Sequence, residues 1–215
     1  MKNDLSKSQL AIFLSTLEGF SEPKVRLEQY AIDSEICADM LHKASFLGDL
    51  RQKVIVDLGC GTGIIGIGAL LMDARKAIFM DTDKDALKIA KKNISKAKSE
   101  TSFNGEVSFI ERNIESIDKD IKADVVYQNP PYGTKIKHND MLFLKKAFEI
   151  APVVYSIHKS ETIPYIRDFS LKHKRAVTHI WDYEFPIKST MKFHKKGIHR
   201  IKVSCIRLIG KIGNK

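Results

Sequence analysis

The stretch Val54-Ile55-Val56-Asp57-Leu58-Gly59-Cys60-Gly61-Thr62-Gly63 decides the fold of this chain. Its first three residues are β-branched, which is typical of a buried strand in a parallel sheet. The glycines that follow predict a tight turn, and the apolar segment 64–72 behind them favours a helix. A strand, a glycine-rich turn and a helix in this order indicate the first unit of a doubly wound α/β sheet.

The same alternation continues along the chain. Further strands are expected at 77–80, 107–110, 123–127 and 153–157, and further helices over 83–94, 140–150 and 161–172. Residues 176–185 and 198–209 are interpreted as a closing pair of strands. The sequence therefore predicts a Rossmann-like sheet with right-handed crossovers and helices on both faces.

The N-terminal part carries helical rather than strand signals. Apolar side chains recur at helical spacing over 4–19, where Gly19 favours a stop, and Asp33 or Ser34 can cap a second helix ending near Leu47. We therefore expect residues 1–50 to form a helical extension packed on the core. Residues 51–215 would form the α/β domain, which ends in basic strands.

Composition and charge suggest a polyanionic partner. The chain has 215 residues and a formal net charge of +10 at pH 7. After Phe185 it contains no acidic residue, and the basic residues there are Lys188, Lys192, Lys195, Lys196, Arg200, Lys202, Arg207, Lys211 and Lys215. This end is a candidate nucleic-acid surface, although a solvated basic edge explains Lys211 and Lys215 more simply.

Cysteine usage and hydropathy indicate the cellular compartment. Cys37, Cys60 and Cys205 are far apart and lack metal-ligand spacing, which fits a reducing compartment and predicts neither a disulfide framework nor a metal site. The N-terminus lacks the pattern of a signal peptide, and no apolar run approaches the length of a membrane span. We expect a cytoplasmic protein with no membrane partner.

Polar loops follow four successive predicted strands, at 57–63, Asp81, Asn113 and 129–132. Because ligands bind at the carboxyl ends of the strands in such sheets, these loops are expected to line one site. In the last loop, Asn129-Pro130-Pro131-Tyr132, the prolines favour extended backbone and remove two N–H donors.

This loop can hold a flat ring that carries an amino group. The side-chain oxygen of Asn129 and the carbonyl of Pro130 can accept the two hydrogens of the amine, while Tyr132 stacks on the ring. Accepting both hydrogens localises the nitrogen lone pair, so that it can attack an electrophile. By itself the tetrapeptide fits a rigid turn equally well.

The glycine loop raises the choice between two cofactors. Gly61-Thr62-Gly63-Ile64-Ile65-Gly66 matches the dinucleotide fingerprint, and Asp81 lies where that motif has its ribose-binding acid. However, Asp57 at the strand end would repel a pyrophosphate. S-adenosylmethionine carries an ammonium and a sulfonium and no phosphate, so a carboxylate there is favourable. We therefore prefer S-adenosylmethionine to a nicotinamide cofactor.

The predicted contacts of this cofactor are spread over three loops. The residues that would bring backbone close to its methionine part are Gly59, Cys60, Gly61, Thr62 and Gly63. Asp81 would accept from both ribose hydroxyls, and Asn113 or the N–H of Ile114 would contact the adenine. Asp57 also has a simpler role as a helix-capping acid, and the two roles are compatible.

The order of 57–63 and then 129–132 resembles the amino-group methyltransferases of the N6-adenine type with an NPPY motif. More closely, the chain resembles the methyltransferase-like enzymes that modify one adenine of small-subunit ribosomal RNA, and their archaeal relatives. The stretches that carry this resemblance are 27–30, 57–63, 81–87, 129–135, 143–145, 154–160 and 193–196.

The resemblance implies a class I enzyme that methylates the N6 amine of an RNA adenine and releases S-adenosylhomocysteine. It implies that Gln29, otherwise a plain linker residue, helps close the cofactor site. It also favours an RNA-contacting role for Phe193, His194, Lys195 and Lys196. Lys135 and Lys137, just past the catalytic loop, can steer a phosphate towards it. The target adenine would be unpaired or flipped into the site.

The chain departs from the family pattern at two positions. Ile32 stands where the family often has a threonine, and Asn113 stands where it has an acid, so the cofactor contacts differ there. In eukaryotes such enzymes resemble an obligate pair with a small zinc-binding activator, which makes an activator of this kind a second candidate partner.

Two other functions share the same motif or fold. Enzymes that methylate a glutamine amide of release factors carry the same tetrapeptide, but they resemble larger proteins with a separate N-terminal substrate domain. A ribosome-assembly factor could instead use the fold to bind RNA without catalysis. DNA stays open as a substrate, because charge does not distinguish the two polymers.

Overall fold

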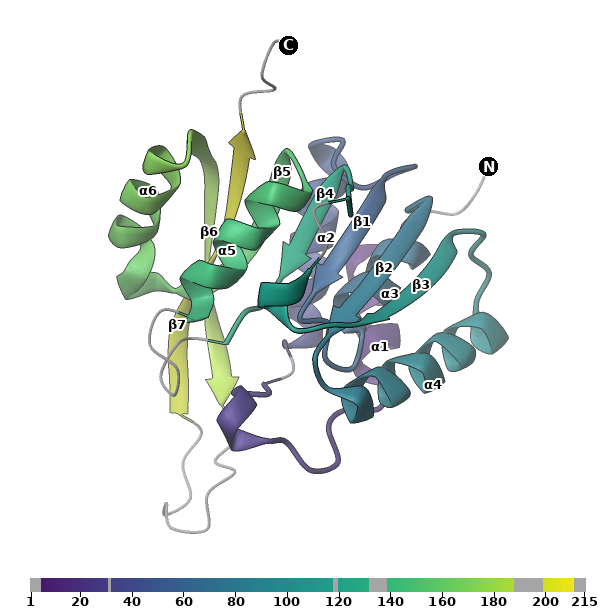
Figure 1. Cartoon of the computed structure of the whole chain (residues 1–215). Coiled ribbons are helices and arrows are strands. Elements are labelled where there is room, and N and C mark those ends of the chain that lie inside the picture. Colours follow the sequence, from purple (N-terminus) through teal and green to yellow (C-terminus); the bar gives the residue numbers. More distant parts are fainter. Residues whose placement is uncertain (1–4, 31, 118–119, 132–138, 188–198, 211–215) are drawn as a thin grey trace.

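The computed structural model describes residues 5–30, 32–117, 120–131, 139–187 and 199–210. These residues form a seven-stranded sheet in the order β3-β2-β1-β4-β5-β7-β6, with helices on both faces (Figure 1). The strands are β1 (Val54–Leu58), β2 (Lys76–Asp81), β3 (Glu106–Glu111), β4 (Val125–Gln128), β5 (Val153–Lys159), β6 (Arg175–Ile187) and β7 (His199–Gly210). The helices are α1 (Lys7–Ser15), α2 (Ser34–Phe46), α3 (Ile64–Leu71), α4 (Lys84–Glu100), α5 (Asn139–Ile150) and α6 (Ile163–Lys172), with short 3-10 helices η1 (Val25–Leu27), η2 (Ile114–Ser116) and η3 (Ser160–Thr162). The predicted doubly wound α/β architecture is confirmed.

The sheet separates two apolar cores. On β1, Ile55 belongs to the core that includes side chains of α1 to α4, whereas Val56 belongs to the core that includes side chains of α5 and α6. Successive side chains of a strand point to opposite faces, so a strand covered on both sides needs apolar residues at every position. This explains the continuous β-branched run at the start of β1.

The N-terminal helix is shorter than the sequence predicts. It begins after Ser6, whose hydroxyl accepts from the N–H of Gln9 while the Gln9 side chain accepts from the N–H of Ser6. It ends at Ser15, and the Thr16 hydroxyl that follows donates to the carbonyl of Phe13. A helix over 4–19 is therefore a wrong prediction, because local side-chain hydrogen bonds set both ends.

The two N-terminal helices share the core of the sheet. Asp33 caps α2 as predicted, accepting from the N–H groups of the next turn. Leu10 of α1 and Met40 of α2 are fully buried. The helices α2 and α3 approach closely at Gly68, where an added Cβ would lie 2.5 Å from Leu41. The N-terminal part is thus built into the fold, beside the strands that carry the site.

The closing pair of strands forms as predicted, but its position was not foreseen. β7 lies antiparallel between β5 and β6, so that Cys205 is opposite Ile157 on one side and opposite Trp181 on the other. The last strand in sequence is therefore an inner strand. Its side chains Val203, Cys205 and Ile206 are fully buried for this reason.

A buried ion pair joins β7 to the loop before β1. The guanidinium of Arg207 donates to both carboxylate oxygens of Asp49, from Nε at 2.6 Å and from Nη2 at 3.2 Å. The hydroxyl of Tyr155 donates to the same carboxylate at 2.7 Å, and that of Tyr127 donates to the Asp49 carbonyl at 2.8 Å. Arg207 therefore belongs to the core rather than to the basic C-terminal surface.

Across the described ranges, no helix is long and apolar enough to cross a membrane. The same ranges contain no group of three or more His, Cys, Asp or Glu side chains placed to hold a metal ion.

Candidate active site

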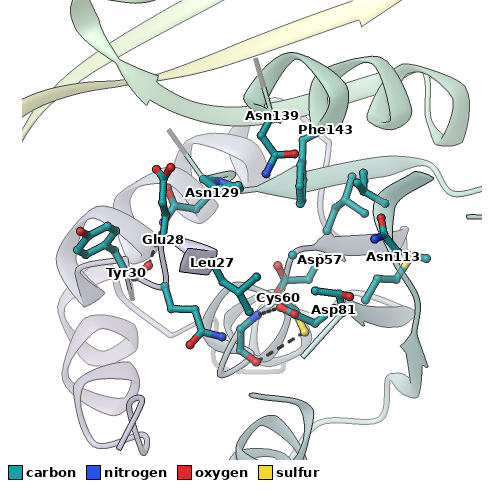
Figure 2. A pocket seen from close by; sticks show the side chains of 18 of the residues that line it. Leu27, Glu28, Tyr30, Asp57, Cys60, Asp81, Asn113, Asn129, Asn139 and Phe143 are labelled. Atoms are coloured by element: carbon teal, nitrogen blue, oxygen red, sulfur yellow. Dashed lines mark hydrogen bonds between the residues drawn. The ribbon is translucent and has the colours of Figure 1, made fainter. Parts of the chain in front are cut away.

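A cavity of about 410 Å³ opens at the carboxyl ends of β1, β2 and β4 (Figure 2). Its volume is in the range of small-molecule sites. The predicted cofactor residues that line it are Gln29, Asp57, Gly59, Cys60, Gly61, Thr62, Asp81, Asn113 and Ile114. Asn129 and Pro131 of the predicted catalytic loop line the same cavity. The four polar loops therefore meet at one site.

The remaining predicted residues do not line the cavity or lie outside the described residues. Gly63 is the N-cap of α3 and packs beside Ala90 and Phe79, where an added Cβ would lie 3.1 Å from Ala90. Pro130 is buried but is not among the lining residues that the structure describes. Outside the described residues are Tyr132, Lys135, Lys137, Phe193, His194, Lys195 and Lys196.

The glycine loop leaves room that side chains would fill. Gly59 and Gly61 have φ of +70° and +53°, a region that favours glycine. A Cβ on Gly59 would lie 2.9 Å from the ring of Phe143, and one on Gly61 would lie 2.8 Å from the ring of Phe20. Two aromatic rings therefore pack against the glycine loop, and they have room there only because Gly59 and Gly61 lack side chains.

Asp57 is buried at the end of β1 and caps α3. Its Oδ2 accepts from the N–H of Gly66 at 2.8 Å, and the residue is 1% exposed. Burial raises the pKa of Asp57 to about 7, and the nearby charge of Asp81 adds to this while the Gly66 hydrogen bond opposes it. A cation placed beside the carboxyl group would favour its charged form.

Asp81 fixes the glycine loop against the end of β2. Its Oδ2 accepts from the N–H of Gly61 and its Oδ1 from the N–H of Asp83, both at 2.8 Å. Burial raises the pKa of Asp81, and these backbone hydrogen bonds oppose that shift. Each carboxylate oxygen has a further lone pair, so the group can still accept from two hydroxyls of a ligand.

Asn113 follows β3 and caps the short helix η2. Its Oδ1 accepts from the N–H of Glu115 at 3.0 Å. The side-chain oxygen is therefore engaged, and the amide hydrogens are the group that Asn113 can offer to a ligand.

Gln29 holds the N-terminal segment over one side of the cavity. Its Nε2 donates to Asp83 at 2.7 Å and its Oε1 accepts from the N–H of Lys24 at 2.8 Å. The ammonium of Lys24 pairs with Asp83 at 2.6 Å and with Asp85 at 3.1 Å. Both ends of the Gln29 amide are thus bound to protein groups. We infer that the residue positions this segment rather than contacting a ligand with its side chain.

Asn129 lines the cavity, and its side chain carries a buried acceptor. Its Nδ2 donates to the carbonyl of Tyr30 at 3.3 Å, which assigns the orientation of the amide. Its Oδ1 is buried and has no hydrogen-bond partner within the described ranges. Leaving a buried acceptor unpaired costs about 1–3 kcal/mol. An acceptor of this kind at a cavity wall marks the place of a ligand donor.

Several lining residues were not singled out from the sequence as site residues. Figure 2 shows Asn139 and Phe143 of α5 across the cavity from Asp81. Tyr30 reaches the site through its backbone carbonyl, which no side-chain motif reveals. The stretches 27–30 and 143–145 carry the family resemblance, and that is the signal that could have found Tyr30 and Phe143.

The residues present fit S-adenosylmethionine better than a dinucleotide. A dinucleotide places its pyrophosphate on the free N–H groups at the start of a helix. Here the carboxylate of Asp57 already accepts from the N–H of Gly66 in the first turn of α3. A buried acid at that point disfavours phosphate and favours the ammonium or sulfonium of S-adenosylmethionine.

The fold and this site define a class I methyltransferase that uses S-adenosylmethionine. The family model described as "Conserved hypothetical protein 95" matches residues 35–179. The chain is also 34% identical over 206 residues to the rRNA N(6)-adenosine-methyltransferase METTL5 of Danio rerio, covering 93% of this chain and 96% of that protein. The chain therefore belongs to the family of that methyltransferase.

Two further comparisons frame this assignment. The chain is similar to PH1948 of Pyrococcus horikoshii, a proposed RNA methyltransferase of known crystal structure, with a TM-score of 0.85, 38% identity and coverage of 96% and 98% of the two chains. It is similar to the release factor glutamine methyltransferase of Mycoplasma mycoides over only 57% of this chain and 41% of that protein, at 34% identity.

Proposed function

We propose that this protein transfers a methyl group from S-adenosylmethionine to the N6 amine of an adenine in RNA, and that its substrate is small-subunit ribosomal RNA. The proposal is carried by the buried Oδ1 of Asn129, a residue of the cavity wall, because this oxygen has no hydrogen-bond partner among the described residues. The adenine amine supplies the donor that this acceptor lacks. The similarity to METTL5 over nearly the full length of both chains supports the choice of substrate.

In this mechanism the protein contributes mainly by positioning. Asn129 accepts one hydrogen of the amine through Oδ1, and the carbonyl of Pro130 is proposed to accept the other. The nitrogen lone pair is then no longer shared with the ring and is directed at the methyl group. When bound, the cofactor supplies an electrophilic methyl on a sulfonium. A bond from nitrogen to carbon forms as the carbon–sulfur bond breaks, S-adenosylhomocysteine leaves, and the amine releases a proton to water.

The cofactor would be held by the loops that follow β1, β2 and β3. Asp57 would neutralise the ammonium or sulfonium, and the glycine loop would accommodate the methionine part. Asp81 would accept from the ribose hydroxyls, and the Asn113 amide with the N–H of Ile114 would contact the adenine edge. Cys60 and Thr62 complete the lining on this side.

The RNA side of the proposal rests on residues outside the described ranges. We propose that Tyr132 stacks on the target adenine, that Lys135 and Lys137 bind phosphate near the loop, and that the segment Phe193-His194-Lys195-Lys196 contacts RNA. The excess of positive charge after Phe185 supports a polyanionic substrate.

The place of action and a further partner are also proposals. We propose that the protein works in the cytoplasm, where ribosomal subunits are available as substrate. We also propose that a small zinc-binding activator assists it, by the resemblance to the eukaryotic enzymes. The release factor enzymes make the main alternative, because a glutamine amide has the same acceptor requirement as an adenine amine.

One experiment compares these functions directly. Labelled S-adenosylmethionine is incubated with small ribosomal subunits, their naked RNA, duplex DNA and release factor, each with and without the activator. We expect label in RNA, recovered as N6-methyladenosine after digestion and lost in Asn129→Ala. Label in release factor or in DNA would show that this molecule, and not RNA, is the substrate. Absence of transfer in every arm, with intact cofactor binding, would favour a non-catalytic RNA-binding role.

A further inference from the structure

Three buried polar side chains lie beneath the Asn129 loop. The amide Nε2 of Gln128 donates to Oγ of Ser156 at 2.9 Å, and that Oγ lies 2.6 Å from Nε2 of His158. All three residues are buried, and the most exposed of them, His158, is 1% exposed. They share one face of the sheet, since Gln128 is opposite Ser156 in the register of β4 and β5.

The donor and the acceptor in each hydrogen bond of this group can be assigned. The Gln128 amide can only donate through Nε2, so Ser156 accepts there and has its own proton to donate to Nε2 of His158. The imidazole proton is then on Nδ1, assigned from the network. That atom lies 3.8 Å from Oδ2 of Asp140, in the first turn of α5. The chain of contacts thus runs from β4 through β5 to α5.

A purely structural role would explain this group poorly. Apolar side chains fill the rest of this core, which includes Val126, Val154 and Leu144. Buried polar groups are unfavourable unless all their hydrogen bonds are made. Here Oε1 of Gln128 and Nδ1 of His158 have no hydrogen-bond partner within the described residues.

The group connects two walls of the candidate active site. Gln128 is bonded through its backbone to Asn129, whose Oδ1 is the proposed acceptor for the amine. Asp140 follows Asn139, which lines the same cavity as Asn129. A shift along the chain of contacts would therefore change the distance between the Asn129 loop and the start of α5.

We propose that Asp140, His158, Ser156 and Gln128 form a positioning array that sets the Asn129 loop against α5 for methyl transfer. The array acts through Asn129 and touches neither substrate nor cofactor. The proposal rests on the proposed function of the site. It predicts a loss in kcat when the array is broken, because a displacement of about 1 Å can cost on the order of 100-fold in rate.

Two variants of His158 separate a polar role from simple filling of space. His158→Phe keeps a ring without polar atoms, whereas His158→Gln can place its amide oxygen near the position of Nε2, where it accepts from Ser156. We expect kcat for methylation of RNA to fall about 10- to 100-fold in His158→Phe and to recover most of this in His158→Gln. KM for RNA and Kd for S-adenosylmethionine should change little in either variant.

A second test replaces Ser156, and another buried serine of the chain provides the matched control. Ser156→Ala should lower kcat as His158→Phe does. Ser170→Ala removes an equally buried hydroxyl that has no hydrogen-bond partner among the described residues, and it should leave kcat unchanged. Equal kcat in Ser156→Ala and wild type, or equal losses in His158→Gln and His158→Phe, would overturn the proposal.

A readout independent of activity distinguishes this proposal from the proposed function. The side-chain amide resonances of Asn129, identified by their loss in Asn129→Ala, report the hydrogen bond to the Tyr30 carbonyl. We expect them to shift in His158→Phe and to return in His158→Gln. Unshifted resonances would overturn the array even if the enzyme is active. Shifted resonances in a protein that methylates no RNA would contradict only the proposed function.

Discussion

The side-chain amide of Asn129 donates to the backbone carbonyl of Tyr30, across 99 residues of sequence. This bond makes the N-terminal segment a wall of the candidate active site. It also sets the chemistry of the loop, because the nitrogen is engaged and the oxygen is left as the acceptor. A division of the chain into an N-terminal extension and a methyltransferase domain therefore does not separate the parts that form the site.

Replacement of Asn129 tests the acceptor. Asn129→Ala should lower kcat on RNA about 100-fold or more, as when one preorganised hydrogen-bonding group is lost from an active site. The Kd of S-adenosylmethionine should stay within about twofold, since the cofactor is held by other loops. Asn104→Ala, at an exposed residue outside the cavity, serves as the control in the same assay. A large loss of cofactor binding in Asn129→Ala would assign the loop to the cofactor instead.

Asp57 should make cofactor binding depend on pH. Burial raises the pKa of Asp57 to about 7, so much of it is protonated below pH 7. A cationic ligand prefers the carboxylate, and the affinity for S-adenosylmethionine should rise about tenfold between pH 5.5 and 7. Calorimetric titrations across this range measure the effect. Asp57→Asn should bind more weakly at pH 7 and show a flat profile, and an unchanged slope in that variant would place the titrating group elsewhere.

The same pKa predicts the opposite trend for the unliganded protein. The ordinary pKa of the carboxyl group is 3.8, and the folded protein raises it to about 7. Between these values the folded state holds a proton that the unfolded state has released. The contribution of Asp57 to the free energy of unfolding should therefore fall as pH rises from about 4 to 7 and level off above. Urea unfolding of wild type and Asp57→Asn at several pH values measures the difference.

The glycine loop can be tested against a matched glycine. Gly59 and Gly48 have φ of +70° and +75°, but a Cβ on Gly59 would meet Phe143 at 2.9 Å, whereas nothing lies within 4 Å at Gly48. Alanine should cost about 1–2 kcal/mol of backbone strain at either position. Only Gly59→Ala should also weaken S-adenosylmethionine binding, by about tenfold, because it moves Phe143 or fills the cavity. Equal affinities in the two variants would argue against contact with this loop.

The ion pair of Arg207 with Asp49 should matter for stability rather than for RNA binding. Arg207→Met leaves the Asp49 carboxylate buried without its cation, which should lower the free energy of unfolding by about 3 kcal/mol or more. Lys202→Met changes an exposed residue of the same strand and should have an effect within about 0.5 kcal/mol. Urea unfolding measures both variants. If Arg207→Met weakened RNA binding and left stability unchanged, Arg207 would belong to the basic surface after all.

Local signals explain why much of the fold was predictable. The caps at Asp33 and Asp83 form where the sequence places them, because a capping side chain bonds to N–H groups two or three residues away. The first helix was predicted too long because the apolar pattern continues past both of its ends. Side-chain hydrogen bonds at Ser6 and Thr16 end the helix inside that pattern.

The amino-acid sequence by itself determined the alternation of strands and helices, the glycine loop after β1 and the polar residues at the strand ends, because these features rest on interactions between near neighbours. Only the tertiary structure decided that β7 lies between β5 and β6, that Arg207 pairs with Asp49, and that Tyr30 orients Asn129. It also decided that His158 is buried in contact with Ser156. Such contacts join residues that are distant in sequence or depend on which face of a strand is covered, so no local pattern of residues encodes them.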